Sequence, residues 1–323
     1  MSDFKLRTEL LLAPSPNKIF HGEKIICMGS CFAENMHQKL TEHGFNSSFS
    51  PYGIVFNAWM LAHQLRRLIA GKEYLDHELI FSNEMFSSWD HHGSFSHPDQ
   101  DVALLQINAH FNDCREKLNH AEYLILTLGT SSIYETKEDR HRVANCHKVP
   151  AQHFTKYRIT LQELISEFNS SFQELRQFNP GCKILISVSP VRYLQDGLVD
   201  NNRSKSCLSM LSEFLEQNFN FVEYFPAFEL LIDDLRDYRF VREDMVHPNS
   251  MAIHYIWQKF SNVFFTKETQ ALNEEILSFQ KKIKHKPLFP NSESSIRFQN
   301  QLKKDIALFK LQHPQVLFPE IGI

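Results

Sequence analysis

The sequence predicts an α/β protein, a three-layer α/β/α sandwich around a central, mostly parallel sheet, with a C-terminal helical appendage. Short, largely apolar runs of strand character alternate along the chain with longer amphipathic stretches of helical periodicity. This alternation is typical of parallel sheets covered by helices on both faces. Three of the strand-like runs end in polar or glycine-containing turns, and parallel sheets bind ligands at the carboxyl ends of their strands.

The individual elements follow from the apolar patterns. Strands are predicted at residues 24–28, 123–128, 183–188 and 221–224. Amphipathic helices are predicted at residues 33–43, 58–70, 104–119, 161–178, 204–219 and 250–260. Consecutive parallel strands need crossover connections, which are right-handed in nearly all known sheets.

The chain changes character after the last of these helices. We predict one large domain over residues 1–262 and a helical extension over residues 263–323, packed on that domain or on a second subunit. The extension carries an apolar stripe at helical spacing, formed by Leu272, Ile276, Phe279 and Ile283, then a proline break and a second amphipathic stretch at 296–311.

Composition narrows the classes of function. The 323 residues have 42% hydrophobic content, a net charge of −4 and a pI near 6.5, which gives no electrostatic case for nucleic acid or an anionic membrane as partner. The first residues lack a secretory apolar stretch, no run is long enough to span a membrane, and the six cysteines show no paired CxxC spacing. These features predict a cytoplasmic protein.

The turn after the first predicted strand is a candidate active-site turn. Gly29 and Ser30 end the strand, and a helical pattern begins at once. Free backbone N–H groups at a helix N-terminus can stabilise an oxyanion, so a hydroxyl there is well placed for nucleophilic catalysis. A serine at this position is also the usual helix N-cap, and the adjacent Cys31 is a less favoured nucleophile.

A second candidate lies late in the chain. Asp244 and His247 are three residues apart, directly before the helix predicted from residue 250. One turn of chain would bring the carboxylate against the imidazole, fixing its tautomer and stabilising its protonated form.

The histidine-rich stretch at residues 88–99 contains His91, His92 and His97 together with two aspartates. These side chains could bind a metal or line a polar pocket. Because no ligand pair has the i, i+4 spacing of HExxH, we expect no metal site and favour the pocket.

Several of these segments resemble one family. Residues 29–33 spell Gly-Ser-Cys-Phe-Ala, the pentapeptide of the GSCFA family, which is similar to a branch of the SGNH-type (GDSL-like) hydrolases. The Ser-His-Pro-Asp run at 96–99, the Asn-Cys-His-Lys run at 145–148, the segment 187–192 and the Asp-x-x-His-Pro run at 244–248 also match. The resemblance extends over about residues 25–260.

The resemblance implies a flavodoxin-like sandwich and a metal-independent ester hydrolase without a cofactor. It implies Ser30 as nucleophile, His247 as general base and acid, and Asp244 as its orienting partner. It also implies backbone oxyanion donors at Ser30 and Gly53. Further oxyanion or substrate contacts are assigned to Asn57, Gly129, Thr130, His91 and His92. Ser131 stands where SGNH enzymes have an asparagine oxyanion donor.

The predicted function is therefore a serine esterase acting on a small O-acyl group, acetyl above all, on a small-molecule or carbohydrate alcohol. An alternative is a catalytically weak or lapsed member that binds a glycan or acylated ligand. A metal-dependent hydrolase centred on His91, His92 and His97 is a minor third option. We expect no nucleic-acid or membrane partner, and a homo-oligomer remains open.

Overall fold

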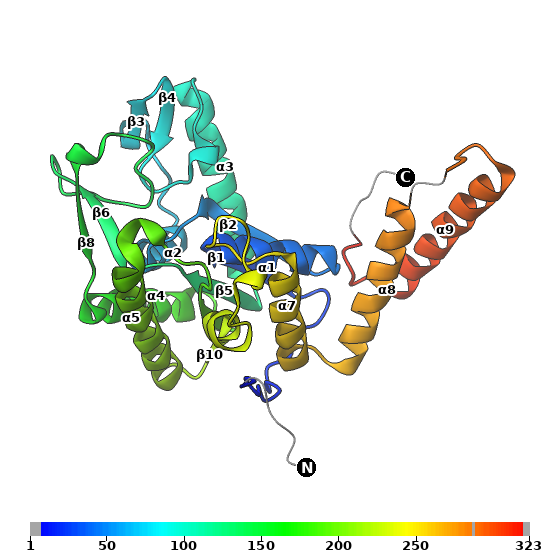
Figure 1. Cartoon of the computed structure of the whole chain (residues 1–323). Helices are drawn as coiled ribbons and strands as arrows, with labels where there is room; N and C mark the ends of the chain where they lie inside the picture. The colour runs from blue at the N-terminus through cyan, green and yellow to red at the C-terminus, as the bar shows by residue number, and fades with distance from the viewer. Residues whose placement is uncertain (1–7, 286–287, 319–323) are drawn as a thin grey trace, which may run out of the picture.

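The structure is a computed structural model, which describes residues 8–285 and 288–318 (Figure 1). Its centre is a five-stranded parallel sheet in the order β10-β9-β5-β1-β2. The strands are β1 (Lys24–Gly29), β2 (Asn46–Ile54), β5 (Tyr123–Leu128), β9 (Lys183–Val188) and β10 (Val222–Tyr224). When only the strands of this sheet are numbered along the chain, their order is the flavodoxin-like 2-1-3-4-5. Successive strands are added on one side of β1 and then on the other, so the order reverses between β1 and β5 although these strands are parallel.

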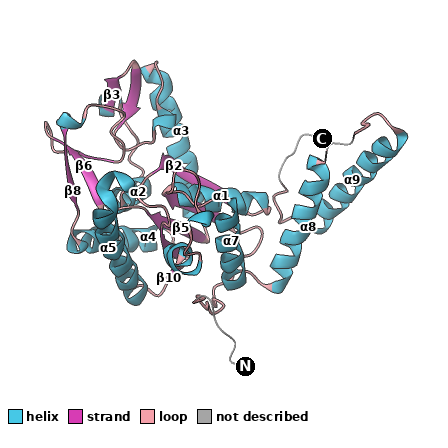
Figure 2. Cartoon of the chain, viewed as in Figure 1, coloured by secondary structure: helices cyan, strands magenta, loops and turns pink. Residues whose placement is uncertain are grey.

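Helices cover both faces of the sheet, as Figure 2 shows. They are α1 (Cys31–Glu42), α2 (Ala58–Ala70), α3 (Gln100–Asn119), α4 (Leu161–Phe178), α5 (Gly197–Asn218), α6 (Ala227–Glu229) and α7 (Ser250–Phe264). The predicted three-layer α/β/α sandwich is therefore confirmed.

Alternate residues of each strand enter different cores. Ile25 and Cys27 of β1 pack with α1 and α7, whereas Ile26 and Met28 pack with the core formed by α2, α3, α4 and α5. Because side chains alternate across a strand, a strand buried on both faces reads as a continuous apolar run. This explains why β1, β5 and β9 are predicted from the sequence.

Strand β2 is missing from the sequence-based prediction. Its sequence is NSSFSPYGI, of which four residues are polar, and it includes Pro51. The strand lies at the edge of the sheet and its pairing with β1 is irregular near Gly29. Proline and polar residues are tolerated at such an edge, where one side of the backbone makes no ladder bonds.

Two small antiparallel sheets were also not predicted. One pairs β3 (Leu79–Ser82) with β4 (Met85–Ser88), and the other has the order β7-β6-β8. Its strands are β6 (Ser132–Thr136), β7 (Arg142–Val143) and β8 (Phe154–Arg158). Short turns of helix lie at Asp76–Glu78, Gly93–Phe95, Ala151–His153, Leu194–Asp196, Leu230–Asp234 and Tyr238–Phe240.

The predicted C-terminal appendage consists of α8 (Lys267–Lys284) and α9 (Glu293–Gln312), which project from the side of the sandwich (Figure 1). They share a separate apolar core, to which Ile276 and Phe309 contribute. The segment after α9 contacts the end of α1, where the Leu317 N–H donates to the Gly44 carbonyl at 2.8 Å. This attachment is one helix length, about 18 Å, from the amino end of α1. The division into domains at residue 262 stays a prediction.

The expectation about the N-terminal segment depends on residues 1–7, which lie outside the described residues. Within the described residues, none of the helices combines the length and apolar character that crossing a membrane requires.

Candidate active site

The turn between β1 and α1 can be built only with glycine at its first position. Gly29 has a φ of +129°, and a Cβ atom there would lie 2.2 Å from the Thr127 carbonyl oxygen. Ser30 follows and is the N-cap of α1, as the common role of serine at this position predicts. The turn therefore places Ser30 and Cys31 at the carboxyl edge of the sheet, beside the β1/β5 reversal point.

Ser30 is almost fully buried, with 1% of its surface exposed. Its hydroxyl accepts the Phe32 N–H at 3.2 Å and lies 2.9 Å from the Thr127 hydroxyl. The Ser30 N–H donates to the Thr127 hydroxyl at 3.0 Å and to the Thr127 carbonyl at 3.2 Å. The backbone N–H that the family resemblance assigns to an oxyanion is thus bonded to the neighbouring strand.

The pairing predicted for Asp244 and His247 is present. The Asp244 Oδ2 lies 2.8 Å from the His247 Nδ1, and Oδ1 accepts the backbone N–H groups of Val246 and His247, both at 2.9 Å. These three hydrogen bonds, the backbone bond from His247 first, lower the pKa of Asp244 to about 2. The carboxylate is therefore ionised at neutral pH and holds the ring through Nδ1, which leaves Nε2 to act on another group.

No hydrogen bond joins His247 to Ser30 within the residues that the structure describes. The charge of Arg242, which belongs to the same loop as His247, acts on the pKa of the Cys31 thiol. Cys31 is half-buried. Burial raises its pKa above the ordinary value, although the charges of Lys205 and Arg242 act in the opposite direction.

Lys205 is a residue of this edge that the sequence analysis missed. It is fully buried on α5, and its Nζ donates to the carbonyl oxygens of Gly129 and Ser189, both at 2.7 Å. Burial lowers its pKa to about 7. Through its two hydrogen bonds, Lys205 connects the turns that follow β5 and β9. Lysine on an amphipathic helix gives no sequence signal for such a position.

The turn after β5 makes mainly structural hydrogen bonds. Thr130 donates its N–H to the Phe56 carbonyl at 2.8 Å, as does Gly129 at 3.1 Å. Ser131, in the place of the expected asparagine, is fully buried and bonds to the Ser204 hydroxyl of α5 through its N–H at 2.7 Å and its hydroxyl at 3.1 Å. Its hydroxyl thus turns toward α5.

Asn57 and Gly53 flank this edge on the β2 side. Asn57 caps α2, because its Oδ1 accepts the Met60 N–H at 2.8 Å, while its Nδ2 donates to the Ser132 carbonyl at 2.7 Å. Both ends of the amide are therefore engaged. Gly53 has a φ of +72°, and a Cβ there would lie 2.7 Å from the Cβ of His92.

The predicted histidine pair separates in the structure. His92 and Gly53 line the same cavity, which opens between β2 and α3. His91 is fully buried among the rings of Tyr52, Tyr74 and Phe95, and neither ring nitrogen has a hydrogen-bond partner within the described residues. Burial lowers its pKa to about 3. The placement of His91 as a pocket-lining residue is corrected, because the aromatic core surrounds it.

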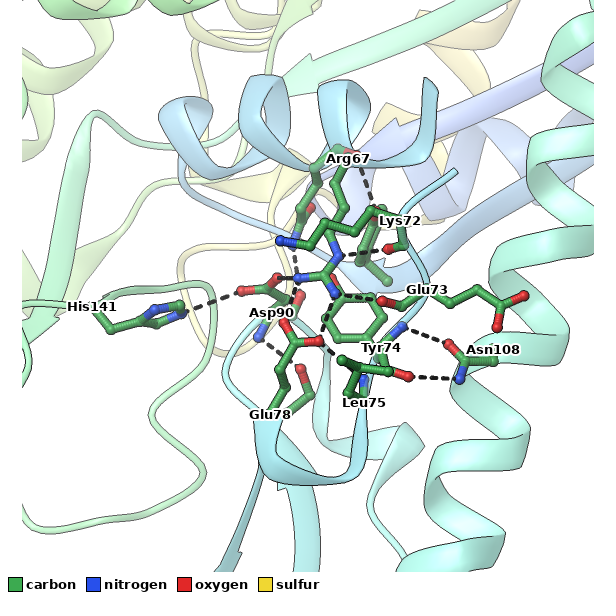
Figure 3. A network of polar contacts seen from close by, with 12 residues as sticks. Arg67, Lys72, Glu73, Tyr74, Leu75, Glu78, Asp90, Asn108 and His141 are labelled. Carbon is green, nitrogen blue, oxygen red and sulfur yellow. Dashed lines mark hydrogen bonds and ion pairs between the residues drawn. The ribbon is translucent and has the colours of Figure 1, made fainter. Parts of the chain in front are cut away.

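Asp90 anchors the histidine-rich stretch to the core (Figure 3). Its Oδ2 accepts the Tyr74 hydroxyl at 2.7 Å, and its Oδ1 lies 3.6 Å from the His141 Nε2. Burial acts to raise the pKa of Asp90, but the contacts with His141 and Tyr74 outweigh it and hold the pKa below its ordinary value. Asp90, one of the polar residues of this stretch, therefore stabilises the fold. Among the described residues, no group of three His, Cys, Asp or Glu side chains is arranged to hold a metal.

Two cavities open near the carboxyl edge. A cleft of about 310 Å³ has Asn57 and Thr130 in its wall, with Phe56 and Tyr193 nearby. A cavity of about 150 Å³ lies between the end of β9, the turn of helix at Leu230–Asp234 and the loop of Asp244 and His247. Asn57 and Thr130 therefore line one cavity, and Met245 and Val246, the two residues between Asp244 and His247, line the other.

The central sheet and its helices make the protein a doubly wound α/β protein. Its candidate site lies at the carboxyl edge of the sheet, where the strand order reverses between β1 and β5. The chain belongs to the GSCFA family, whose family model matches residues 24–260. No curated protein matches the sequence. Among solved structures, a carbohydrate esterase of family 3 from Talaromyces cellulolyticus matches this chain at 12% identity, with a TM-score of 0.35, and the match covers 78% of this chain and 99% of that one.

Proposed function

We propose that the protein is an ester hydrolase of the SGNH type, with Ser30 as nucleophile and the Asp244–His247 pair as its base. The observation that carries the proposal is the 2.8 Å contact between Asp244 and His247, with Nε2 of the ring left for another group. The proposed substrate is a small O-acyl ester, acetyl above all, of a small-molecule or carbohydrate alcohol, and the proposed compartment is the cytoplasm.

The hydrogen bonds of Ser30 are compatible with this role. A hydroxyl oxygen has two lone pairs and one proton. If the Thr127 hydroxyl donates to Ser30, the Ser30 proton is left for His247 Nε2, and the bond from Thr127 or from the Phe32 N–H opens to free the lone pair that attacks the carbonyl. Hydrogen bonds of catalytic groups are often longer in unliganded proteins and shorten when substrate binds.

The reaction would proceed by acyl transfer. His247 removes the proton of Ser30 as the Ser30 oxygen attacks the ester carbonyl. The tetrahedral intermediate that forms carries a negative charge, which hydrogen-bond donors must stabilise. Since the Ser30 N–H donates to Thr127, we assign the oxyanion to the N–H groups of Cys31 and Gly53. Cys31 opens α1 and has no intrahelical acceptor for its N–H. His247 then protonates the leaving alcohol, and water hydrolyses the acyl-enzyme.

A second candidate is the same reaction with Cys31 as the nucleophile. Cys31 is half-buried, whereas only 1% of the surface of Ser30 is exposed. It also lies where the charges of Lys205 and Arg242 favour a thiolate, although burial outweighs them.

A third candidate is a protein that binds its ligand without turnover. It is supported by Ser131, which stands where an asparagine donor is expected, and by the amide of Asn57, which is already hydrogen-bonded at both ends.

Activity-based labelling distinguishes these candidates. Wild type and the variants Ser30→Ala, Cys31→Ala and His247→Ala are treated in parallel with a fluorophosphonate and with iodoacetamide. Fragmentation mass spectra then locate each adduct within the peptide that holds both residues. Ser206→Ala, an exposed serine of α5, is the control.

The serine mechanism predicts a fluorophosphonate adduct on Ser30 that is lost in Ser30→Ala and His247→Ala and retained in Cys31→Ala and Ser206→Ala. Rapid alkylation of Cys31 that depends on His247, without a Ser30 adduct, would replace it by the thiol mechanism. Folded protein with neither adduct would overturn both and leave the binding protein.

A further inference from the structure

The cavity beside the Asp244–His247 pair has a mixed wall. Leu231, Leu235 and Val246 provide its apolar surface, and Val246 directly precedes His247 in the chain. Arg192, from the turn after β9, and Arg236, two residues after the helical turn at Leu230–Asp234, line it as well. Pockets that bind small ligands are typically apolar with a few polar groups that fix the orientation of the ligand.

The two arginines of this cavity differ from most others in the chain. Arg66, Arg67 and Arg142 each pair with a glutamate at 2.7 to 3.3 Å. Within the described part of the chain, neither Arg192 nor Arg236 makes a side-chain hydrogen bond or an ion pair.

One carboxylate lies in the same wall but is already engaged. Asp237 accepts the Arg239 N–H at 2.9 Å, and its other oxygen lies 3.3 Å from the Arg239 guanidinium. Arg192, which is half-buried, and Arg236, which is exposed, thus bring two positive charges to a cavity with a partly apolar wall, in a protein whose net charge is −4. Guanidinium groups present paired N–H donors that match the oxygens of a carboxylate or phosphate.

We propose that this cavity binds an acidic group, a carboxylate or a phosphate carried on an apolar body, between Arg192 and Arg236. Placing that group on the substrate rests on the proposed function, and it makes the substrate an acidic ester. The binding site itself does not depend on Ser30. The apolar wall receives the body of the ligand, the arginines hold its acidic group, and the reacting ester lies toward His247.

Calorimetric titration at low ionic strength tests the site with three probes of similar shape, benzoate, phenyl phosphate and benzyl alcohol. The full chain is used as wild type, Arg192→Gln, Arg236→Gln and Ser30→Ala. Arg297→Gln, an exposed arginine of α9 that pairs with Glu293, is the matched control.

At least one of the two anions is expected to bind ten times more tightly than benzyl alcohol, and the stronger anion identifies the acidic group as carboxylate or phosphate. Arg192→Gln and Arg236→Gln are each expected to weaken that anion about tenfold, while Ser30→Ala and Arg297→Gln bind it as wild type does. Equal binding of anions and alcohol, or undiminished anion binding by both glutamine variants, would overturn the proposal. Anion binding without any Ser30 adduct would preserve this site and refute the serine hydrolase.

Discussion

The hydroxyl oxygen of Ser30 lies 2.9 Å from the hydroxyl oxygen of Thr127, across the junction of β1 and β5. Both side chains are buried. The Ser30 N–H adds a second bond to the same Thr127 hydroxyl at 3.0 Å. Thr127 therefore determines how the candidate nucleophile is held at the start of α1.

This contact predicts energetic coupling between the two residues. In a cycle of Ser30→Ala, Thr127→Val and the double variant, we expect a coupling of about 0.5–1.5 kcal/mol in the free energy of unfolding, the usual net value of a hydrogen bond. Valine keeps the shape of threonine, so packing is nearly preserved. Urea unfolding followed by circular dichroism measures it, and strictly additive effects of the two substitutions would contradict it.

The second prediction concerns the orientation of His247. In Asp244→Asn the ring loses the carboxylate 2.8 Å from Nδ1 and can adopt the wrong tautomer. We expect turnover of p-nitrophenyl acetate to fall by about ten-thousandfold, as in serine proteases. The fold should be unchanged, because 47% of the Asp244 side chain is exposed and asparagine keeps an oxygen that can accept the two backbone N–H groups.

Asp233→Asn, an exposed carboxylate of the preceding helical turn, is the matched control and should turn over as wild type does. Since the pKa of Asp244 is about 2, the wild-type rate should show no titration of this carboxyl between pH 4 and 8. A loss of less than tenfold in Asp244→Asn would argue against the pair as the catalytic base.

The third prediction follows from the burial of Lys205. Its pKa is about 7 in the folded chain against 10.5 ordinarily. Between these values the amine is neutral when folded and protonated when unfolded, so the unfolded chain binds more protons and stability rises with pH. The stability of wild type relative to Lys205→Met should therefore increase from pH 7 to 10, by at most about 1.4 kcal/mol per pH unit.

Urea unfolding of both proteins at several pH values gives this difference, in which the other titrating groups cancel. Lys304→Met, an exposed lysine of α9, should show no such trend. A difference between wild type and Lys205→Met that is flat with pH would mean that the buried amine keeps an ordinary pKa.

The sequence predicts the parts of this fold that depend on one local pattern. The strands at 123–128 and 183–188 and the helices at 58–70 and 161–178 have the predicted bounds, because each carries a full apolar face. Strand β2 has no such pattern, since its conformation depends on pairing with β1 at the sheet edge. Strand β2 can therefore be identified only from the tertiary structure.

The candidate site divides in the same way. Asp244 and His247 are close in sequence, so their spacing predicts their contact. Thr127 and Lys205 reach the start of α1 and the turn at Gly129 from distant segments, and each contact depends on the packing of other elements. The burial of His91 was missed for a related reason, because a polar stretch gives no sign of the aromatic core that surrounds one of its members.

The last prediction concerns that histidine. The pKa of His91 is about 3 in the folded chain against 6.5 ordinarily, so the ring stays neutral in the core while the unfolded chain takes up a proton below pH 6.5. The unfolded state then binds more protons, and wild-type stability should fall as pH decreases from 6.5 to 3. His91→Phe removes this term and places an apolar ring among Tyr52, Tyr74 and Phe95.

At pH 7 we expect His91→Phe to be at least as stable as wild type, because phenylalanine buries no nitrogen without a partner. Its advantage should grow by at most about 1.4 kcal/mol per pH unit on acidification. Urea unfolding at pH 7, 5.5 and 4.5 measures this, with the exposed His153→Phe as control. If His91→Phe and wild type lose stability equally on acidification, His91 accepts a proton within the folded chain. The loop at residues 88–97 would then have to open, and His91 would be able to reach a ligand.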